Sequence, residues 1–249
     1  AHVSVSVVSP IMLANGWTFD RSEGSNGDHL HNMDFMHQIY TAHKIDYSGR
    51  VTVPVLWDKK NNCIVSNESS EIIRMFNSAF NGITNNHDDY YPTALHEKIE
   101  TVNQRVYHCI NNGVYRAGFA TSQTAYEKAY GELFDALNWV EATLSEQAYL
   151  CGDVITEADW RLFTTLIRFD AVYHGHFKCN QQRLEDYPNI SNYLRALYQW
   201  PEVAKTVNFD HIKRHYYSSH TMINPTRVVP VGPAIDYSRP HNRLRFNTL

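Results

Sequence analysis

Hydrophobic positions change their spacing along the chain. Between Val3 and Val8, β-branched and small polar residues alternate, which predicts that the chain begins on a strand. The segments Val51 to Trp57 and Cys63 to Val65, joined by a polar turn, predict a β-hairpin. Between Asn32 and His43 the apolar residues recur at helical spacing, and the acidic, serine-rich start near Glu68 predicts a further helix. The first part of the chain therefore mixes strands with helices.

The remainder of the chain has helical spacing. Residues 77–92 are rich in Asn, Asp and Gly, which is typical of a linker. Four amphipathic helices are predicted after it: Leu95 to Ile110, Tyr126 to Leu144, one starting with the capping box Thr156-Glu157-Ala158-Asp159, and one after Tyr187-Pro188. The first two should pack antiparallel. Scattered prolines after Met222 predict an extended tail.

These patterns predict two domains. Residues 1–86 form a small α/β portion, and residues 87–249 form an all-helical C-terminal domain with an extended tail.

Composition excludes several classes of function. With 43% hydrophobic residues in 249, the chain can bury real cores and is not mainly disordered. The net charge is −4 and the basic residues form no run, which argues against nucleic acid as a partner. Because we find neither a signal peptide nor an apolar stretch of about 20 residues, we expect a cytoplasmic protein without a membrane span. Four cysteines, far apart and without a CxxC pair, fit a reducing compartment.

A strand containing Val53-Pro54, then a hairpin, then a helix opening at Glu68-Ser69 resembles the second half of a thioredoxin-like glutathione-binding domain, in which the bond before the proline is cis. A cis bond there turns the backbone of the preceding residue outward, where it can pair with a bound peptide such as glutathione. The N–H groups of a helix start suit the γ-glutamyl carboxylate. The alternative is that Glu68 and Ser69 only cap their helix.

Several longer segments are similar to the glutathionyl-hydroquinone reductases, also called xi-class glutathione transferases. They include Gly16-Trp17-Thr18-Phe19, Thr52 to Asp58, Asn112 to Tyr115, Arg168 to Asn180 and His211 to Pro225. The resemblance covers essentially the whole chain. It implies a glutathione-transferase fold, in which residues 1–86 form a partial thioredoxin-like glutathione-binding domain and residues 87–249 form the all-helical C-terminal domain with an extended tail. It also implies glutathione as co-substrate, aromatic hydroquinone conjugates as substrates and a homodimer.

The resemblance also implies roles for individual residues. Glutathione would be bound by Trp17, Arg50, Val51, Thr52, Val53, Glu68 and Ser69, and the hydroquinone would be surrounded by Tyr115, Tyr173 and Tyr216. Three phenols suit an aromatic diol because each can stack on the ring or exchange a hydrogen bond and a proton with a hydroxyl group. Alternatively, each tyrosine is a packing residue and Trp17 is a half-buried core residue.

In this family a cysteine thiolate attacks the sulfur of the glutathionyl-hydroquinone, and a second glutathione resolves the mixed disulfide. The family's cysteine lies in a Cys-Pro motif, which we expect upstream of Ala1. By motif, none of Cys63, Cys109, Cys151 and Cys179 replaces it. A non-catalytic glutathione-binding or assembly module is therefore an alternative. A conjugating glutathione transferase is a weaker one.

Histidines offer a competing site. His211 and His215 are spaced i, i+4 with His220 nearby, and His174 and His176 form a second pair. No acidic residue completes an HExxH motif, so we predict no metal site and interpret these histidines as polar neighbours of the tyrosines.

Overall fold

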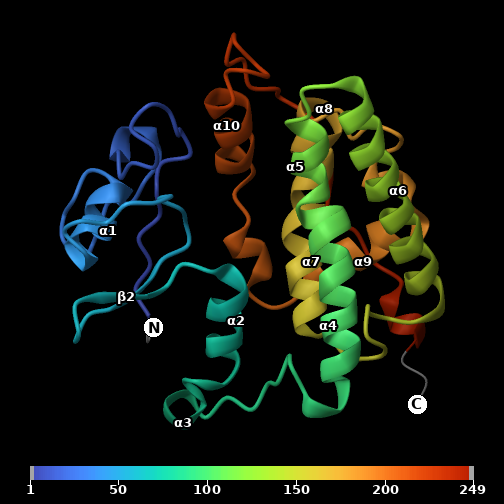
Figure 1. Cartoon of the computed structure of the whole chain (residues 1–249). Helices are drawn as coiled ribbons and strands as arrows, with labels where there is room; N and C mark the ends of the chain where they lie inside the picture. The colour runs from blue at the N-terminus through green and yellow to red at the C-terminus, as the bar shows by residue number, and fades with distance from the viewer. Residues whose placement is uncertain (1–2, 247–249) are drawn as a thin grey trace. The chain divides into compact units, whose positions relative to one another are not determined.

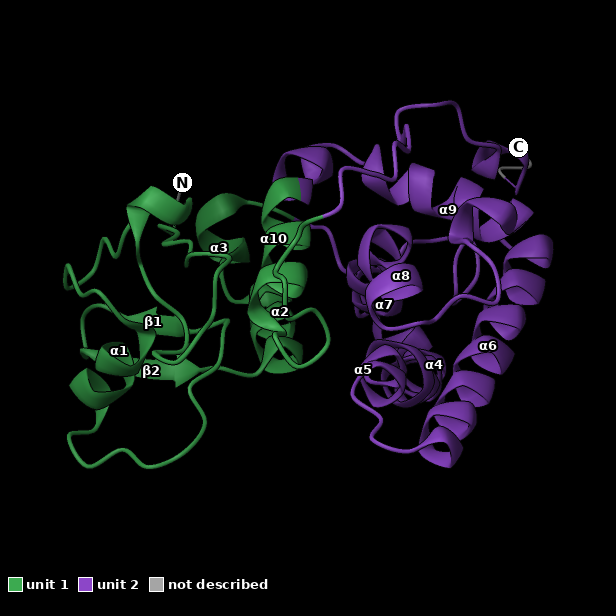
Figure 2. Cartoon of the chain, turned by 90° about the horizontal axis from the view of Figure 1, so that it is seen from above, with its two compact units in different colours: residues 1–86, 210–229 green, residues 87–209, 230–249 purple. Residues whose placement is uncertain are grey.

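The computed structural model describes residues 3–246 and contains two compact units (Figure 2). Unit 1 comprises residues 1–86 and 210–229, and unit 2 comprises residues 87–209 and 230–249. The first change of unit thus falls between Asn86 and His87, while residues 210–229 are grouped with the N-terminal residues. The assignment of all residues 87–249 to one helical domain stays a prediction.

Unit 1 contains a two-stranded sheet and a set of short helices (Figure 1). Its elements are η1 (Arg21–Glu23), α1 (Met36–His43), β1 (Leu56–Asp58), β2 (Cys63–Ser66), α2 (Ser69–Ser78), α3 (Asn81–Thr84) and α10 (Phe209–Ser219), the last from Asp210 onward. The predicted helices around Asn32 to His43 and after Glu68 are confirmed. The first is expected within Asn32 to His43 and begins at Met36. Phe35 is its N-cap residue, and the Gln38 side chain satisfies the Phe35 N–H at 2.9 Å.

The predicted opening strand is wrong. Residues 3–8 form no strand, and their backbone is bonded to side chains of a later loop. Asn26 Oδ1 accepts from the Val7 N–H at 2.6 Å, and Asn26 Nδ2 donates to the Val5 carbonyl at 3.1 Å. The alternation of Val and Ser could not reveal this, because side-chain partners satisfy the backbone as well as a neighbouring strand does.

The predicted hairpin is present but shorter than expected. β1 and β2 are antiparallel, with Trp57 opposite Ile64, and a bulge interrupts the register between Leu56 and Trp57. The Val53–Pro54 peptide bond is cis, as expected. Residues 51–55 lie outside the ladder, and their valines pack against a core cluster of Phe19, Met36, Ile39 and Tyr40. Since proline has no N–H, the ladder cannot extend through residue 54.

Unit 2 is helical. Its elements are η2 (Thr93–Leu95), α4 (His96–Arg105), the π-helical η3 (Val106–Asn111), α5 (Gly113–Gly118), α6 (Gln123–Glu146), α7 (Glu157–Arg168), the π-helical η4 (Phe169–Tyr173), α8 (His174–His176), η5 (Leu184–Asp186), α9 (Pro188–Tyr198), η6 (Val203–Thr206) and η7 (Arg243–Phe246). The four predicted long helices are confirmed. In Figure 1 the chain runs one way through α4 and α5 and returns through α6, which packs on α5 and η3.

The capping box of α7 organises the centre of unit 2. Asp159 is fully buried, and its Oδ2 accepts from the N–H and the hydroxyl group of Thr156 at 2.7 and 2.9 Å. Its Oδ1 accepts from the Leu150 N–H at 2.9 Å and from the Tyr193 hydroxyl at 2.8 Å. A buried carboxylate needs such partners, and here they join α7 to the preceding loop and to α9.

Among the described helices, none is both long enough and apolar enough to span a bilayer.

Candidate functional site

Trp17 lies against the core cluster of unit 1 and stacks on His215 of α10. The ring centroids are 4.7 Å apart and the planes meet at 19°. His215 Nδ1 lies 2.9 Å from the Pro10 carbonyl oxygen; because a carbonyl only accepts, this nitrogen carries the proton. His215 is thereby held between the N-terminal loop and Trp17, with its ring plane fixed.

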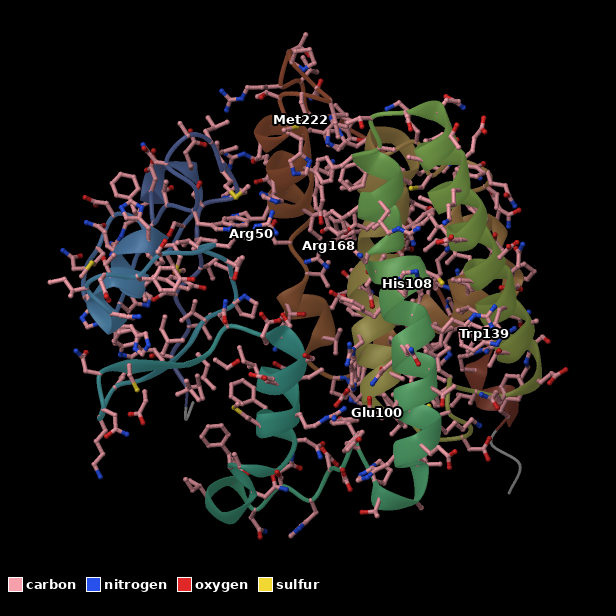
Figure 3. All side chains as sticks on the ribbon, in the orientation of Figure 1. Arg50, Glu100, His108, Trp139, Arg168 and Met222 are labelled. Carbon is pink, nitrogen blue, oxygen red and sulfur yellow. The ribbon has the colours of Figure 1, made fainter. Side chains whose placement is uncertain are left out.

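Residues 50–53 follow Tyr47 and run past Tyr40. The Tyr47 hydroxyl donates to the carbonyl of Arg50, an exposed residue that is labelled in Figure 3. The Tyr40 hydroxyl donates to the Thr52 carbonyl at 2.8 Å and accepts from the Thr52 N–H at 3.3 Å. Among residues 3–246, no hydrogen bond engages the backbone of Val51 or Val53. Within this segment, the two valines therefore offer backbone groups for pairing with a peptide.

The start of α2 carries Glu68 and Ser69. Glu68 occupies the N-cap position without a capping hydrogen bond from its side chain, and both side chains are exposed. Instead, Ser66 Oγ accepts from the Glu68 N–H at 3.0 Å and donates to Glu71 at 2.7 Å. The Glu68 side chain therefore does not cap this helix, and the start of α2 carries the positive end of the helix dipole.

One hydrogen bond connects these two segments. Asn67 Nδ2 donates to Thr52 Oγ1 at 3.0 Å, which ties the residue before Glu68 to the residue before Val53. The predicted glutathione residues of unit 1 therefore share neighbours. Trp17 and the valines pack against the core cluster that contains Tyr40, and Tyr40 bonds to Thr52. Asn67 connects Thr52 to the start of α2.

Tyr216 follows His215 in α10 and is 5% exposed. Its ring meets that of His215 edge-on at 5.1 Å and that of His220 at 5.5 Å. His215 thus contacts both Trp17, predicted for glutathione, and Tyr216, predicted for the hydroquinone. From the sequence, this histidine is interpreted only as a metal ligand or a polar neighbour of the tyrosines. Its stacking on Trp17 could not be predicted from the i, i+4 spacing of histidines.

Tyr115 and Tyr173 lie together in unit 2. Their ring centroids are 5.9 Å apart with the planes at 60°, and Phe177 is 5.5 Å from each of them. Phe177 is fully buried and Tyr173 is 2% exposed, whereas Tyr115 is half-buried. Gly118 makes this packing possible, since a Cβ there would stand 2.2 Å from the Phe177 ring. Tyr115 accordingly presents the more open of the two phenols.

The four cysteines are free thiols. Burial raises the pKa of Cys179 to about 12 and also raises the pKa of Cys151. A high pKa keeps a thiol protonated and unreactive, so neither suits a thiolate nucleophile. Among residues 3–246, no group of three or more His, Cys, Asp or Glu side chains is arranged to hold a metal ion.

Comparison with known proteins gives the family. Residues 123–196 match the family described as glutathione S-transferase, C-terminal domain. The chain is 55% identical over 246 residues to the glutathionyl-hydroquinone reductase YqjG of Escherichia coli K12, covering 98% of this chain and 75% of that protein.

Two solved structures of this family are similar to the chain along nearly its whole length. The glutathione-bound structure of YqjG superposes with a TM-score of 0.95 at 55% identity, covering 96% of this chain and 78% of that one. A xi-class glutathione transferase from Natrialba magadii gives a TM-score of 0.94 at 47% identity, covering 97% and 74%. These matches confirm the predicted thioredoxin-like and all-helical fold class. The chain belongs to the glutathionyl-hydroquinone reductases, the xi class of the glutathione transferases.

Proposed function

We propose that this protein reduces glutathionyl-hydroquinones to hydroquinones with glutathione as co-substrate. The observation that carries the proposal is the 55% identity to a glutathionyl-hydroquinone reductase along 98% of the chain. The geometry of each unit is consistent with it: unit 1 holds features suited to a peptide thiol, and unit 2 holds a pair of phenols.

In unit 1, the Val53 backbone would pair with the peptide part of glutathione. The start of α2 would receive the γ-glutamyl carboxylate, because its N–H groups carry a positive dipole end and the Glu68 side chain does not cap them. Ser69 would add a hydroxyl donor. Trp17 would lie against the bound tripeptide, with His215 behind it. Arg50 would add positive charge for a carboxylate.

For the hydroquinone, we propose Tyr115, Tyr173 and Tyr216 as the surrounding phenols. Each can donate to a ring oxygen or pass a proton. Tyr115 and Tyr173 are already paired in unit 2, while Tyr216 belongs to unit 1.

The proposed reaction has two steps, and in each of them a thiolate attacks a sulfur atom. The thiolate of the Cys-Pro cysteine expected upstream of Ala1 forms a disulfide with the glutathionyl sulfur, and the bond from that sulfur to the ring breaks. The ring carbon keeps the electron pair and takes a proton, giving the hydroquinone. A second glutathione thiolate then attacks the mixed disulfide, so that glutathione disulfide leaves and the cysteine thiolate is restored. Overall the ring is reduced, and the thioether sulfur of the conjugate and the thiol of the second glutathione are oxidised to the disulfide.

The test uses protein expressed from its complete gene, incubated with glutathione and a glutathionyl-hydroquinone. Hydroquinone and glutathione disulfide should form in equal amounts. Tyr216→Phe should slow turnover by about tenfold or more, in line with general acid–base effects, while Tyr107→Phe serves as control because Tyr107 is 57% exposed in unit 2. Glutathione binding without turnover would support the non-catalytic module instead. Transfer of glutathione to an electrophile would support a conjugating enzyme.

We further propose that the protein acts in the cytoplasm as a homodimer. Light scattering of the purified protein should give twice the monomer mass; a monomer would refute the assembly.

A further inference from the structure

The two tyrosines of unit 2 each stand beside a π-helical turn. η3 ends at Asn111, shortly before Tyr115, and Tyr173 is the last residue of η4. In η3 the wider turn shows in the bond from the Asn112 N–H to the Tyr107 carbonyl, at 2.8 Å. One residue inserted into an α-helix rotates the following side chains by about 100°. The directions of both phenols therefore depend on these turns being held.

The side chain of Asn111 attaches the first turn to α7. Its amide nitrogen donates to Thr165 Oγ1 at 2.6 Å and to the Arg161 carbonyl at 3.1 Å. Both amide hydrogens are thus used on one neighbouring helix. Thr165 is 5% exposed, so its hydroxyl group depends on protein partners. Figure 3 locates the two elements by His108 in η3 and Arg168 at the end of α7.

This attachment has a defined register. Asn103 in α4 donates to Glu157 at the start of α7 at 3.0 Å, across a separation of 54 residues, and Asn111 reaches Thr165 across the same separation. The α4–η3 segment therefore runs parallel to α7, with one hydrogen bond near each end. The second bond lies where both segments pass into the parts that carry Tyr115 and Tyr173.

The relation between the two rings depends on that register. Tyr115 follows η3 in α5, and Tyr173 follows α7 through η4, so the phenols sit on different segments. The 5.9 Å between the ring centroids, and the contact of both rings with Phe177, require the two segments not to slide along each other. The bond from Asn111 to Thr165 is a polar contact between these two segments, and it lies close along the chain to both tyrosines.

We propose that Asn111 and Thr165 are positioning residues for the hydroquinone site: their hydrogen bond sets the spacing and angle of Tyr115 and Tyr173. The inference rests on the proposed function for its substrate. The spacing itself can be measured without any activity.

The experiment compares Thr165→Val, which removes the hydroxyl group at nearly constant shape, with Thr165→Ser, which restores it. Thr164→Val is the matched control, because Thr164 is the exposed neighbour whose hydroxyl bonds only within α7, to the Arg161 carbonyl. Asn111→Ala removes the donor and provides a second variant. Each protein is assayed for glutathionyl-hydroquinone reduction and for glutathione affinity, and crystal structures give the ring separation.

We expect Thr165→Val and Asn111→Ala to lower kcat/KM for the conjugate by about fivefold to a hundredfold, the range that small misplacements cause. Glutathione affinity should be unchanged, and Thr165→Ser and Thr164→Val should behave as the wild type. The Tyr115–Tyr173 separation should change in the two impaired variants. An unchanged separation, or equal losses in Thr165→Ser and Thr165→Val, would overturn the inference. A wild type that does not reduce the conjugate would refute the proposed function, and the ring separation alone would then decide the positioning role.

Discussion

The indole ring of Trp17 and the imidazole ring of His215 stack at 4.7 Å with only 19° between their planes. The two residues are far apart in the sequence, yet both belong to unit 1. The contact joins the loop after the N-terminal segment to α10. It gives Trp17 a fixed backing on one face, which matters if its other face meets glutathione.

This stacking predicts a loss of glutathione affinity in His215→Leu. Removing an aromatic pair of about 0.5–1.5 kcal/mol should raise the Kd for glutathione by about twofold to thirteenfold. Titration calorimetry measures this directly. His211→Leu, one turn earlier on α10, is the control and should keep the wild-type Kd. An unchanged Kd in His215→Leu would show that Trp17 needs no backing.

The close contact of Gly118 with Phe177 predicts that Gly118→Ala is harmful. Its new Cβ would lie 2.2 Å from two atoms of the buried Phe177 ring, so the ring must move against Tyr115 and Tyr173. We expect a loss of about 1–3 kcal/mol in the free energy of unfolding, typical of overpacking.

Gly131→Ala is the matched control for this change. Gly131 lies in α6, and a methyl group there would meet no side chain and no backbone of another element within 4 Å. The variant should therefore gain about 0.5–1 kcal/mol from helix propensity. Denaturant titration checks both variants. Equal stabilities would refute the predicted clash.

Asp170 should make stability fall as pH rises. Burial raises its pKa from 3.8 to about 6, although its carboxylate accepts from the Leu184 and Glu185 N–H groups at 2.7 and 3.1 Å. Between these pH values the unfolded chain releases the proton and the folded chain keeps it. The free energy of unfolding should therefore drop by about 3 kcal/mol across this window and stay lower above it.

Asp170→Asn removes this titration. The difference in unfolding free energy between wild type and variant should change by that amount between about pH 3 and about pH 7, a range that extends roughly one unit beyond the window on each side. Denaturant titrations at a series of pH values provide the measurement. A constant difference across the range would contradict the raised pKa.

The Asp159 network predicts unequal losses from two of its members. Asp159→Ala leaves buried N–H and hydroxyl groups of Leu150, Thr156 and Tyr193 without their acceptor, and we expect about 3–5 kcal/mol lost. Tyr193→Phe removes a single bond and should cost about 1–2 kcal/mol. Thermal and denaturant unfolding compare the two. A larger loss in Tyr193→Phe would refute the central role of the carboxylate.

Elements with a local signal could be predicted from the amino-acid sequence. The spacing of apolar residues in α6, the Thr156–Asp159 capping box of α7 and the proline at the start of α9 each act within one or two helical turns, and all three helices are present. The segments similar to the family likewise led to the correct fold class and family, because similarity along nearly the whole chain reflects a common fold and can be recognised without any geometry.

Features that depend on distant partners required the folded chain. Val3 to Val8 has the pattern of a strand, but the side chain of Asn26 forms hydrogen bonds with the Val7 N–H and the Val5 carbonyl. His215 has the spacing of a metal ligand, but it stacks on Trp17. Asn111 carries no motif at all, and its bond to Thr165 exists because two helices lie side by side in one register. Such contacts join residues brought together by packing, and a linear pattern does not encode which distant side chain will satisfy a given group.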